Sequence, residues 1–436
     1  MSLLGDFRSL DRRVFILGAA RMVVTLGFAA VLPYLGVVLH QERQVPATVI
    51  GVIWTVAGLS GAVMQWVAGE VADRLGRRPV LLSAMALRTV NLVALGYAIG
   101  HRGPILSIAA LVVLNSVLRG FFDPVASAMV ADLSAGPHRI AAFSLQRIGV
   151  NIGWALGSLA PGISRALDLP FGQLFYVSAA ITLVATWAAS TIVETHATGR
   201  TSTSTSTPTS SSTSGQPPAA GLPAFWRFGI FRSVNLHSYW RDRRYMGFLL
   251  ASLCYFLLQA QLYAPLSLYA ADHLRLDLGA VSHLYLTNGL MVVALQLPAF
   301  FYIRRVGPER VLIAGGLAYA VSYALCGLAT DQASLLACVG LVTLSEIMSA
   351  PAQQTAMTMM APLGRVGAYA GLFGLTQSVG QSLGPLLGTA LLDALPDRLT
   401  WPLLALFGVA AALIFRRVLA QDPTHPPTCA PVAGVG

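Results

Sequence analysis

The stretch Gly69-Glu70-Val71-Ala72-Asp73-Arg74-Leu75-Gly76-Arg77-Arg78 separates two long apolar segments of the chain. Two helices that pack as a hairpin need a short polar turn between them, and Gly69 and Gly76 permit a tight backbone there. Asp73 can cap a helix or pair with a cation, and the three arginines hold the turn on one side of a bilayer. This pattern predicts a membrane-embedded helical hairpin with a charged turn.

The composition of the whole chain agrees with a membrane location. Of the 436 residues, 55% are hydrophobic and 11% are charged, and the mean hydropathy is +0.67. A soluble domain carries about 25% charged residues. All 28 basic residues are arginine, and no basic run alternates with aromatics in the way that a nucleic-acid groove requires. We therefore expect a lipid bilayer, and no nucleic acid, as the partner of this basic chain.

Twelve segments are long enough to cross a bilayer as helices, which takes about 20 apolar residues each. Hydrocarbon requires that the backbone groups of a segment are paired, and these runs are too long and too continuous for barrel strands. We therefore expect an all-α membrane protein with twelve transmembrane helices. The expected spans lie near residues 14–39, 46–68, 79–100, 104–131, 140–163, 171–193, 245–270, 280–303, 310–329, 333–360, 366–391 and 400–418.

Arginines are distributed unequally between the two sets of connecting segments. Nineteen lie before the first span, in the loops that follow even-numbered spans, in the middle segment and after the last span, whereas the opposite loops hold five. Because positive charge is retained on the cytoplasmic side, both termini and the middle segment are expected in the cytoplasm. We expect a multi-pass protein of the plasma membrane, which is the inner membrane of a bacterium.

The chain divides into two halves of six spans each. Residues 1–197 and 242–420 are expected to form two six-helix bundles. Residues 198–241 begin with a run of Thr, Ser, Pro and Gly that cannot bury a core, so we expect a partly disordered cytoplasmic linker. Residues 421–436 are expected to be a disordered tail.

The two halves resemble each other in sequence. When the chain is shifted by 227 residues, Pro124 meets Pro351 and Gly153 meets Gly380. Weak internal symmetry of this kind favours two pseudo-symmetric bundles related by an axis normal to the membrane.

Three polar residues share one face of the fourth span, because Asn115, Arg119 and Asp123 are spaced i, i+4, i+8. A charge inside a bilayer is costly unless it faces the protein interior or a water-filled cavity. Arg119 and Asp123 are therefore candidates for a proton-coupling pair at a central cavity. A static brace between helices is the alternative interpretation.

Glu346, in the tenth span, is the strongest candidate for a proton-binding site. Removal of water from around a carboxyl favours its neutral form, so protonation near neutral pH becomes feasible. Pro351 follows five residues later and favours a bend in the helix. The alternative is a carboxyl that is permanently bonded to a neighbouring helix.

Polar residues of the other spans are candidates for the wall of a substrate cavity. We expect spans 1, 4, 5, 7, 8, 10 and 11 to line it. The candidates, apart from Glu346, are Tyr34, Asn115, Gln146, Arg147, Asn151, Gln261, Asn288 and Gln377. Arg119 and Arg147 in such a cavity would suit an anionic substrate.

Enzymatic chemistry has little support in the sequence. The eight histidines are scattered, and the four cysteines show no metal-ligand or disulfide spacing. No phosphate-binding loop is present, which disfavours ATP-driven pumping. We expect no enzyme activity, no metal and no cofactor, with a proton gradient as the energy source.

These residues resemble the major facilitator superfamily over almost the whole chain, and within it the bacterial twelve-helix proton-coupled multidrug exporters. The loop from Gly69 to Arg78 resembles the family's first motif, and Arg119 takes the place of the family's arginine in the fourth helix. The resemblance implies that Asp73 helps to lock the closed interface and that membrane carboxylates, here Asp123 and Glu346, carry protons. It implies a conformational switch loop formed by Gly69, Asp73, Arg74, Gly76, Arg77 and Arg78.

The chain also departs from these relatives. Its first span has no acidic residue and instead holds Arg21, and the fifth span has Gly157-Ser158 where the exporter motif has Gly-Pro. The expected function is proton-coupled export of small amphiphilic or drug-like compounds by a monomer that works by alternating access. The alternatives are a proton-coupled transporter of a defined nutrient or metabolite, such as a sugar or peptide, and a non-transporting membrane scaffold.

Overall fold

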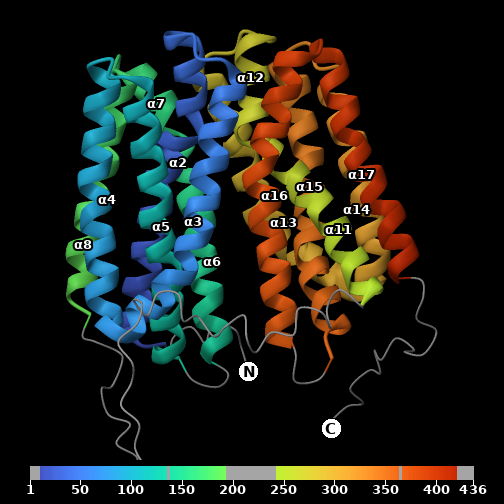
Figure 1. Cartoon of the computed structure of the whole chain (residues 1–436), viewed down its shortest axis with the longest axis horizontal. Helices are drawn as coiled ribbons and strands as arrows, with labels where there is room; N and C mark the ends of the chain where they lie inside the picture. Colours follow the sequence, from blue (N-terminus) through green and yellow to red (C-terminus); the bar gives the residue numbers. More distant parts are fainter. Residues whose placement is uncertain (1–9, 135–137, 193–241, 363–365, 420–436) are drawn as a thin grey trace, which may run out of the picture.

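The computed structural model describes residues 10–134, 138–192, 242–362 and 366–419, which are helical almost throughout (Figure 1). The predicted linker 198–241 and tail 421–436 lie outside the described residues. The helices are α2 (Arg12–Arg43), α3 (Ala47–Leu75), α4 (Arg77–Gly100), α5 (Ile105–Leu133), α6 (His138–Gly157), α7 (Ala160–Ala166), α8 (Phe171–Ser190), α11 (Arg243–Gln259), the short 3-10 helix η2 (Ala260–Leu262), α12 (Ala264–Asp272), α13 (Leu278–Val306), α14 (Pro308–Cys326), α15 (Gln332–Met360), α16 (Val366–Ala394) and α17 (Asp397–Leu419).

Ten spans of the described chain are long and apolar enough to cross a membrane. The other two predicted spans correspond to α6 and α16, which are also helical but more polar. Both lie where the two halves meet, because α6 packs against α13 and α16 packs against α3. A helix that contacts protein on several sides exposes less surface to lipid, so it tolerates the polar residues that lower its hydropathy. The predicted all-α membrane fold is confirmed.

Two of the predicted spans are each divided by a break. The fifth consists of α6 and α7, and the seventh consists of α11, η2 and α12. Pro161 and Pro265 lie in the first turn after each break, where proline's missing N–H leaves no unpaired donor. The hydroxyl of Tyr34 donates to the freed Ser158 carbonyl at 3.1 Å, and the hydroxyl of Tyr323 donates to the Leu258 carbonyl at 2.7 Å. The breaks therefore cost few hydrogen bonds.

The two halves lie side by side and repeat one backbone plan, as the blue-green and yellow-red parts of Figure 1 show. Gly76 between α3 and α4 has φ 92° and ψ 147°, and Gly307 between α13 and α14 has φ 92° and ψ 146°. Asp11 and Asp242 cap the first helix of each half by accepting a hydrogen bond from a backbone N–H. A positive φ favours glycine, so each tight helix turn depends on its glycine.

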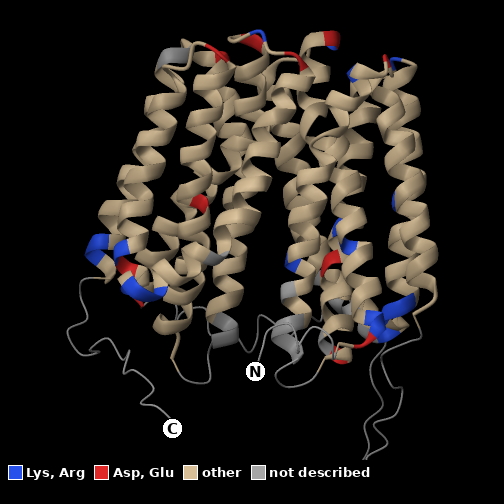
Figure 2. Ribbon diagram, turned by 180° about the vertical axis from the view of Figure 1, so that it is seen from behind, with Lys and Arg blue, Asp and Glu red and all other residues tan. Residues whose placement is uncertain are grey.

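Charged residues gather at the ends of the bundle (Figure 2). We call the end of the bundle where α2 starts and α17 ends the Arg-rich end, and we call the opposite end the far end. The described arginines of the Arg-rich end are Arg12, Arg13, Arg74, Arg77, Arg78, Arg243, Arg244, Arg304, Arg305, Arg310, Arg416 and Arg417. Arg43, Arg102, Arg165 and Arg275 lie at the far end. This division follows the two sets of loops that the sequence distinguishes.

Candidate functional site

A cavity of about 400 Å³ lies between the two halves. Its aromatic walls come from both halves, since Phe28, Trp54 and Trp154 belong to the first and Tyr263 to the second. The ring centroids of Trp154 and Tyr263 are 5.6 Å apart, and those of Trp154 and Phe28 are 5.7 Å apart. The remaining lining residues are Pro33, Ala57, Gly58, Gly61, Ala62, Gln65, Ser116, Arg119, Gly120, Asp123, Ala264, Ser378, Gln381, Ser382 and Pro385.

Asp123 lies between two arginines on the wall of this cavity. Its Oδ2 is 3.5 Å from Arg119 Nε, one helical turn earlier, and its Oδ1 is 3.5 Å from Arg21 Nη2 on α2. Arg21 Nη1 also donates to Ser127 Oγ at 3.0 Å and to Gln146 Oε1 at 2.9 Å. The Arg119 guanidinium lies over the Phe28 ring, 4.5 Å from its centroid. Arg21 is therefore part of the charged cluster.

A further arginine is buried behind the cluster. Arg88 on α4 is 1% exposed, and its Nε donates to Asn115 Oδ1 at 3.2 Å. Its terminal nitrogen Nη2 donates to the Val24 carbonyl oxygen at 3.4 Å. Asn115 therefore holds Arg88 in the core of the first half and does not line the cavity.

Glu346 is held by amide groups of two neighbouring helices. Gln259 Nε2, at the end of α11, donates to Glu346 Oε1 at 2.8 Å, and Asn288 Nδ2 on α13 donates to Oε2 at 3.1 Å. The same Asn288 amide lies 3.1 Å from Thr343 Oγ1. Gln381, a cavity residue, donates to Gln259 Oε1 at 3.3 Å. A chain of two amides thus connects the carboxyl to the cavity wall.

The charged turn after α3 is attached to its own half. Arg77 Nη1 donates to the Ala128 carbonyl at 3.1 Å and forms an ion pair with Asp132. Arg78 Nη2 donates to the Ser190 carbonyl at 2.7 Å. These bonds join the turn to the ends of α5 and α8 at the Arg-rich end. The side chain of Asp73 lies outside the described part of the structure.

The eight predicted cavity residues are absent from the described cavity lining. Three of them join helices, since Tyr34 donates to the Ser158 carbonyl, Gln146 accepts from Arg21, and Gln261 donates to the Gly384 carbonyl at 2.9 Å. Asn115 and Asn288 bind Arg88 and Glu346, as described above. Asn151 and Gln377 are half-buried, and the exposed Arg147 is close enough to Glu346 to interact electrostatically.

The sequence interpretation missed the aromatic and serine residues of the wall. Trp154 precedes the break at Gly157, and Tyr263 precedes Pro265 at the other break. An aromatic residue close to a glycine or proline that can break a helix was the sequence signal that could have identified Trp154 and Tyr263 as cavity residues. Trp54, Ser378 and Ser382 had no comparable signal, because their position depends on how α3 and α16 meet.

Most of the described polar contacts between the two halves lie at the far end, while one, from Thr55 Oγ1 to the Ser382 carbonyl at 2.7 Å, lies deeper beside the cavity. His40 Nε2 is 2.8 Å from Asp272 Oδ2, and Arg165 Nη1 is 3.0 Å from Asp277 Oδ2. Asp393 on α16 accepts from the Thr48 backbone N–H at 2.7 Å in the first turn of α3. Close approach of these helices needs Gly51, since a Cβ there would lie 2.8 Å from the Leu386 Cα.

Comparison with known proteins agrees with this architecture. The family description Major Facilitator Superfamily matches residues 17–295 and 248–435. The chain is 26% identical to Multidrug resistance protein MdtH of Cronobacter sakazakii over 442 residues, which cover 98% of each chain. It is 26% identical to the protein of the same name from Edwardsiella ictaluri, covering 93% of this chain and 94% of the relative.

Solved structures share the fold at lower identity. A crystal structure of the nucleoside transporter NupG superposes with a TM-score of 0.75 at 12% identity, covering 93% of this chain and 100% of that one. A POT family transporter in complex with 5-aminolevulinic acid superposes with a TM-score of 0.72 at 14% identity, covering 94% and 95%. The chain therefore belongs to the Major Facilitator Superfamily, as a non-enzymatic, multi-pass membrane transporter of small molecules.

Proposed function

We propose that the protein exports small amphiphilic compounds in exchange for protons, by alternating access between its two halves. The observation that supports this most directly is the cavity between the halves, with aromatic walls and with charged groups near the middle of the bundle. Its volume of about 400 Å³ is in the range of small-molecule sites, about 300–1,000 Å³. The full-length likeness to proteins named for multidrug resistance supports export over nutrient uptake.

Glu346 is the proposed proton-binding residue. Its carboxylate accepts hydrogen bonds from Gln259 and Asn288, which lie on helices other than its own. Protonation removes a charge from the membrane interior and weakens both bonds, which biases the packing of α11, α13 and α15 by several kcal/mol. A proton couples to transport only if it changes the relative free energies of the two conformations. A carboxyl that bridges three helices meets this requirement.

Arg119 and Asp123 are proposed to couple the proton site to the substrate. They line the cavity themselves, whereas Glu346 reaches it through Gln259 and Gln381. Tyr263 lies within electrostatic reach of both Arg119 and Glu346. A substrate at the aromatic wall therefore contacts Arg119 directly and lies within electrostatic range of Glu346.

The structure is best explained as an inward-open state. Most described polar contacts between the halves lie at the far end, and the lining of the cavity extends along α3 from Trp54 to Gln65, toward the Arg-rich end. Because arginines are retained in the cytoplasm, the Arg-rich end and both termini are proposed to be cytoplasmic. The protein is then a monomer of the bacterial plasma membrane that presents its cavity to the cytoplasm.

The switch loop, Gly69, Asp73, Arg74, Gly76, Arg77 and Arg78, is proposed to control the closing of the Arg-rich end. The bonds of Arg77 and Arg78 to α5 and α8 make the loop move with the first half. Closing then brings this rigid turn toward α16 of the other half.

Transport by inverted membrane vesicles tests the proposal. Respiration acidifies their lumen, so an exporter driven by protons accumulates an amphiphilic dye or drug there. Glu346→Gln is expected to lower accumulation by about ten-fold or more, a loss of about 1.4 kcal/mol. Glu309→Gln makes the same chemical change at the start of α14, outside the expected spans, and is expected to retain activity.

Two results would contradict the proposal. If no amphiphile responds to the pH gradient, proton-coupled export is wrong. If compounds accumulate only in right-side-out vesicles, the protein is an importer, which the nutrient-transport alternative requires.

A further inference from the structure

We infer that the transported compounds carry a carboxylate on an aromatic body, and that Arg119 binds that carboxylate. The inference rests on the proposed function only in taking the cavity as the transport site. It goes beyond that function because it names the charge and shape of the substrate and the residue that selects them.

Arg119 presents a free edge to the cavity. Its Nε faces Asp123 at 3.5 Å and its flat face covers Phe28, while 43% of the side chain is exposed. In the described part of the chain, its two terminal nitrogens make no hydrogen bond of their own. These two nitrogens form a planar fork that matches the two oxygens of a carboxylate. The stack on Phe28 fixes the plane of this fork in advance.

The charges around the cavity favour an anion. Among the described residues, the cavity wall and its neighbours carry the cations Arg21, Arg88, Arg119 and Arg147, but only the carboxyls Asp123 and Glu346. The surplus is positive, so an anionic substrate lowers the electrostatic free energy of the cavity and a cationic substrate raises it.

Arg147 provides an approach for such an anion. It shares a face of α6 with Asn151 and with Trp154, a cavity residue, at positions i, i+4 and i+7. Arg147 is exposed and lies about two turns nearer to the Arg-rich end than Trp154. An anion that enters from that end meets Arg147 first and Arg119 deeper in the cavity.

The rest of the wall fits the aromatic part of the compound. Phe28, Trp154 and Tyr263 form a continuous set of rings with centroid distances below 6 Å. Such rings stack on or pack edge-to-face against a flat aromatic body. A molecule with its carboxylate on Arg119 extends this body across the seam to Tyr263, so that it contacts both halves.

Asp123 competes with the substrate for Arg119. Its carboxylate already lies beside the guanidinium, at a distance longer than a good hydrogen bond. Removal of its charge leaves the Arg119 fork to the substrate. The carboxylate affinity therefore depends on both residues, in opposite directions.

The test measures binding to the purified full-length protein without a proton gradient. The probes are three aromatic acids, benzoate, naphthalene-2-carboxylate and quinoline-3-carboxylate, each compared with its own carboxamide by calorimetry and thermal stabilisation at pH 7.5. The amide keeps the shape and removes the charge. We expect the wild type to bind the larger acids about ten-fold or more tightly than their amides.

Four variants assign this preference. Arg119→Gln is expected to abolish it while amide binding persists, and Arg119→Lys to reduce it, because lysine has charge without a planar fork. Asp123→Asn is expected to increase acid affinity by about three-fold or more. Arg310→Gln, an exposed arginine of α14, is the control for loss of one positive charge and is expected to leave the preference unchanged.

The outcomes separate this inference from the proposed function. Equal binding of acids and amides by the wild type, or binding of neither, overturns the inference, and so does a preference that survives Arg119→Gln. If the acid preference is present but no gradient drives export in vesicles, the proposed function fails and the substrate assignment stands.

Discussion

The two halves of the molecule place opposite charges at equivalent positions. Arg119 is the fifteenth residue of α5 and Glu346 is the fifteenth residue of α15. Phe28 is the seventeenth residue of α2, and Gln259 is the seventeenth residue of α11. In the first half the cation lies over the ring of Phe28, and in the second the carboxyl accepts from the amide of Gln259. One backbone plan therefore supports a site suited to anions and a site suited to protons.

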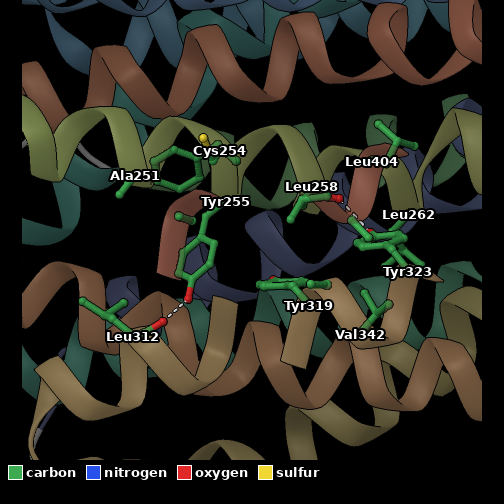
Figure 3. Packing of buried hydrophobic residues seen from close by; sticks show 14 of the residues in the cluster. Ala251, Cys254, Tyr255, Leu258, Leu262, Leu312, Tyr319, Tyr323, Val342 and Leu404 are labelled. Carbon is green, nitrogen blue, oxygen red and sulfur yellow. Dashed lines mark hydrogen bonds between the residues drawn. The ribbon is translucent and has the colours of Figure 1, made fainter. Parts of the chain in front are cut away.

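The cores behind these sites differ in the same way. Arg88 is the twelfth residue of α4, and Tyr319 is the twelfth residue of α14. Both residues are buried. Figure 3 shows Tyr319 beside Tyr255 and Tyr323, whose hydroxyls donate to the Leu312 and Leu258 carbonyls. The first half has a buried guanidinium where the second has a tyrosine. The second core thus pairs its buried hydroxyls with backbone, while the first depends on a charge.

The largest expected effect is on the stability of the first half. Arg88→Met leaves Asn115 Oδ1 without a donor and removes the additional donor of the Val24 carbonyl, which is expected to cost about 3 kcal/mol of unfolding free energy. The melting temperature of the purified protein is the measurement. Tyr319→Phe, at the equivalent position, is expected to change the unfolding free energy by less than about 1 kcal/mol.

A second variant sharpens this comparison. Arg88→Met with Asn115→Val copies the apolar character of the second half, where Val342 is equivalent to Asn115. The pair is expected to recover part of the loss, because no amide oxygen is left unpaired. Equal melting temperatures for the single and double variants would contradict this account.

The next effect concerns the pH dependence of export. Gln259→Leu removes a donor to the Glu346 carboxylate, which destabilises its charged form, so protonation persists to higher pH. We expect the pH midpoint of vesicle transport to rise by about one unit, which corresponds to about 1.4 kcal/mol. Phe28→Leu changes the equivalent position of the other half and is expected to weaken acid binding while leaving that midpoint in place. A shift of the midpoint in both variants, or in neither, would remove the distinction between the sites.

The far end gives a smaller effect. Asp393 of the second half caps the first turn of α3 in the first half, so this cap exists only while the far end is closed. Asp393→Ala is expected to cost the closed state about 1 kcal/mol. The far-end-open population should rise by about five-fold, as measured by spin-label distances across the seam.

The control for this prediction is a cap within one half. Asp331 accepts from the Ser334 N–H at the start of α15 and touches no residue of the other half in the described chain. Asp331→Ala is expected to lower thermal stability slightly without changing the distance distribution. A similar shift in both variants would indicate general loosening and not loss of the closing contact.

The smallest effect is expected at the cap of the first helix. The backbone N–H of Arg13 holds the pKa of Asp11 below its ordinary value of 3.8. Because the folded pKa is depressed, this stabilisation is present above the ordinary pKa and is lost as the pH falls through the lower folded value. Asp11→Asn should lower the melting temperature at pH 7 by an amount equivalent to less than about 1 kcal/mol, since the pair is exposed. The difference from wild type should shrink below about pH 4; a constant difference would contradict it.

Much of the fold was predictable because its determinants are local. Each span is visible as an apolar run, and the turns at Gly76 and Gly307 have nearly the same backbone angles because glycine alone adopts that φ easily. The breaks at Ser158 and Tyr263 were not predicted, although Pro161 and Pro265 were visible. A proline permits a break, but neighbouring hydroxyls such as those of Tyr34 and Tyr323 decide whether the freed carbonyls are satisfied.

The candidate site was less predictable. Arg119 and Asp123 lie on the cavity wall, whereas the polar residues expected beside them mainly join helices to one another. In a membrane protein a buried amide or hydroxyl must find a partner, and Gln146, Gln261 and Asn288 found theirs on neighbouring helices. Polarity within a span indicated burial but not which side of the helix faces the cavity.

By itself, the sequence determined the number and order of the membrane helices, the arginine-rich side, and the presence of charged residues within spans. These follow from the cost of exposing charge or unpaired backbone to hydrocarbon, which acts on each segment separately. Only the tertiary structure decided that Arg21 pairs with Asp123, that Phe28 supports Arg119, and that Trp54, Trp154 and Tyr263 meet across the seam. Those contacts depend on how each helix is rotated and how the two halves dock, and both are set by the packing of all helices together.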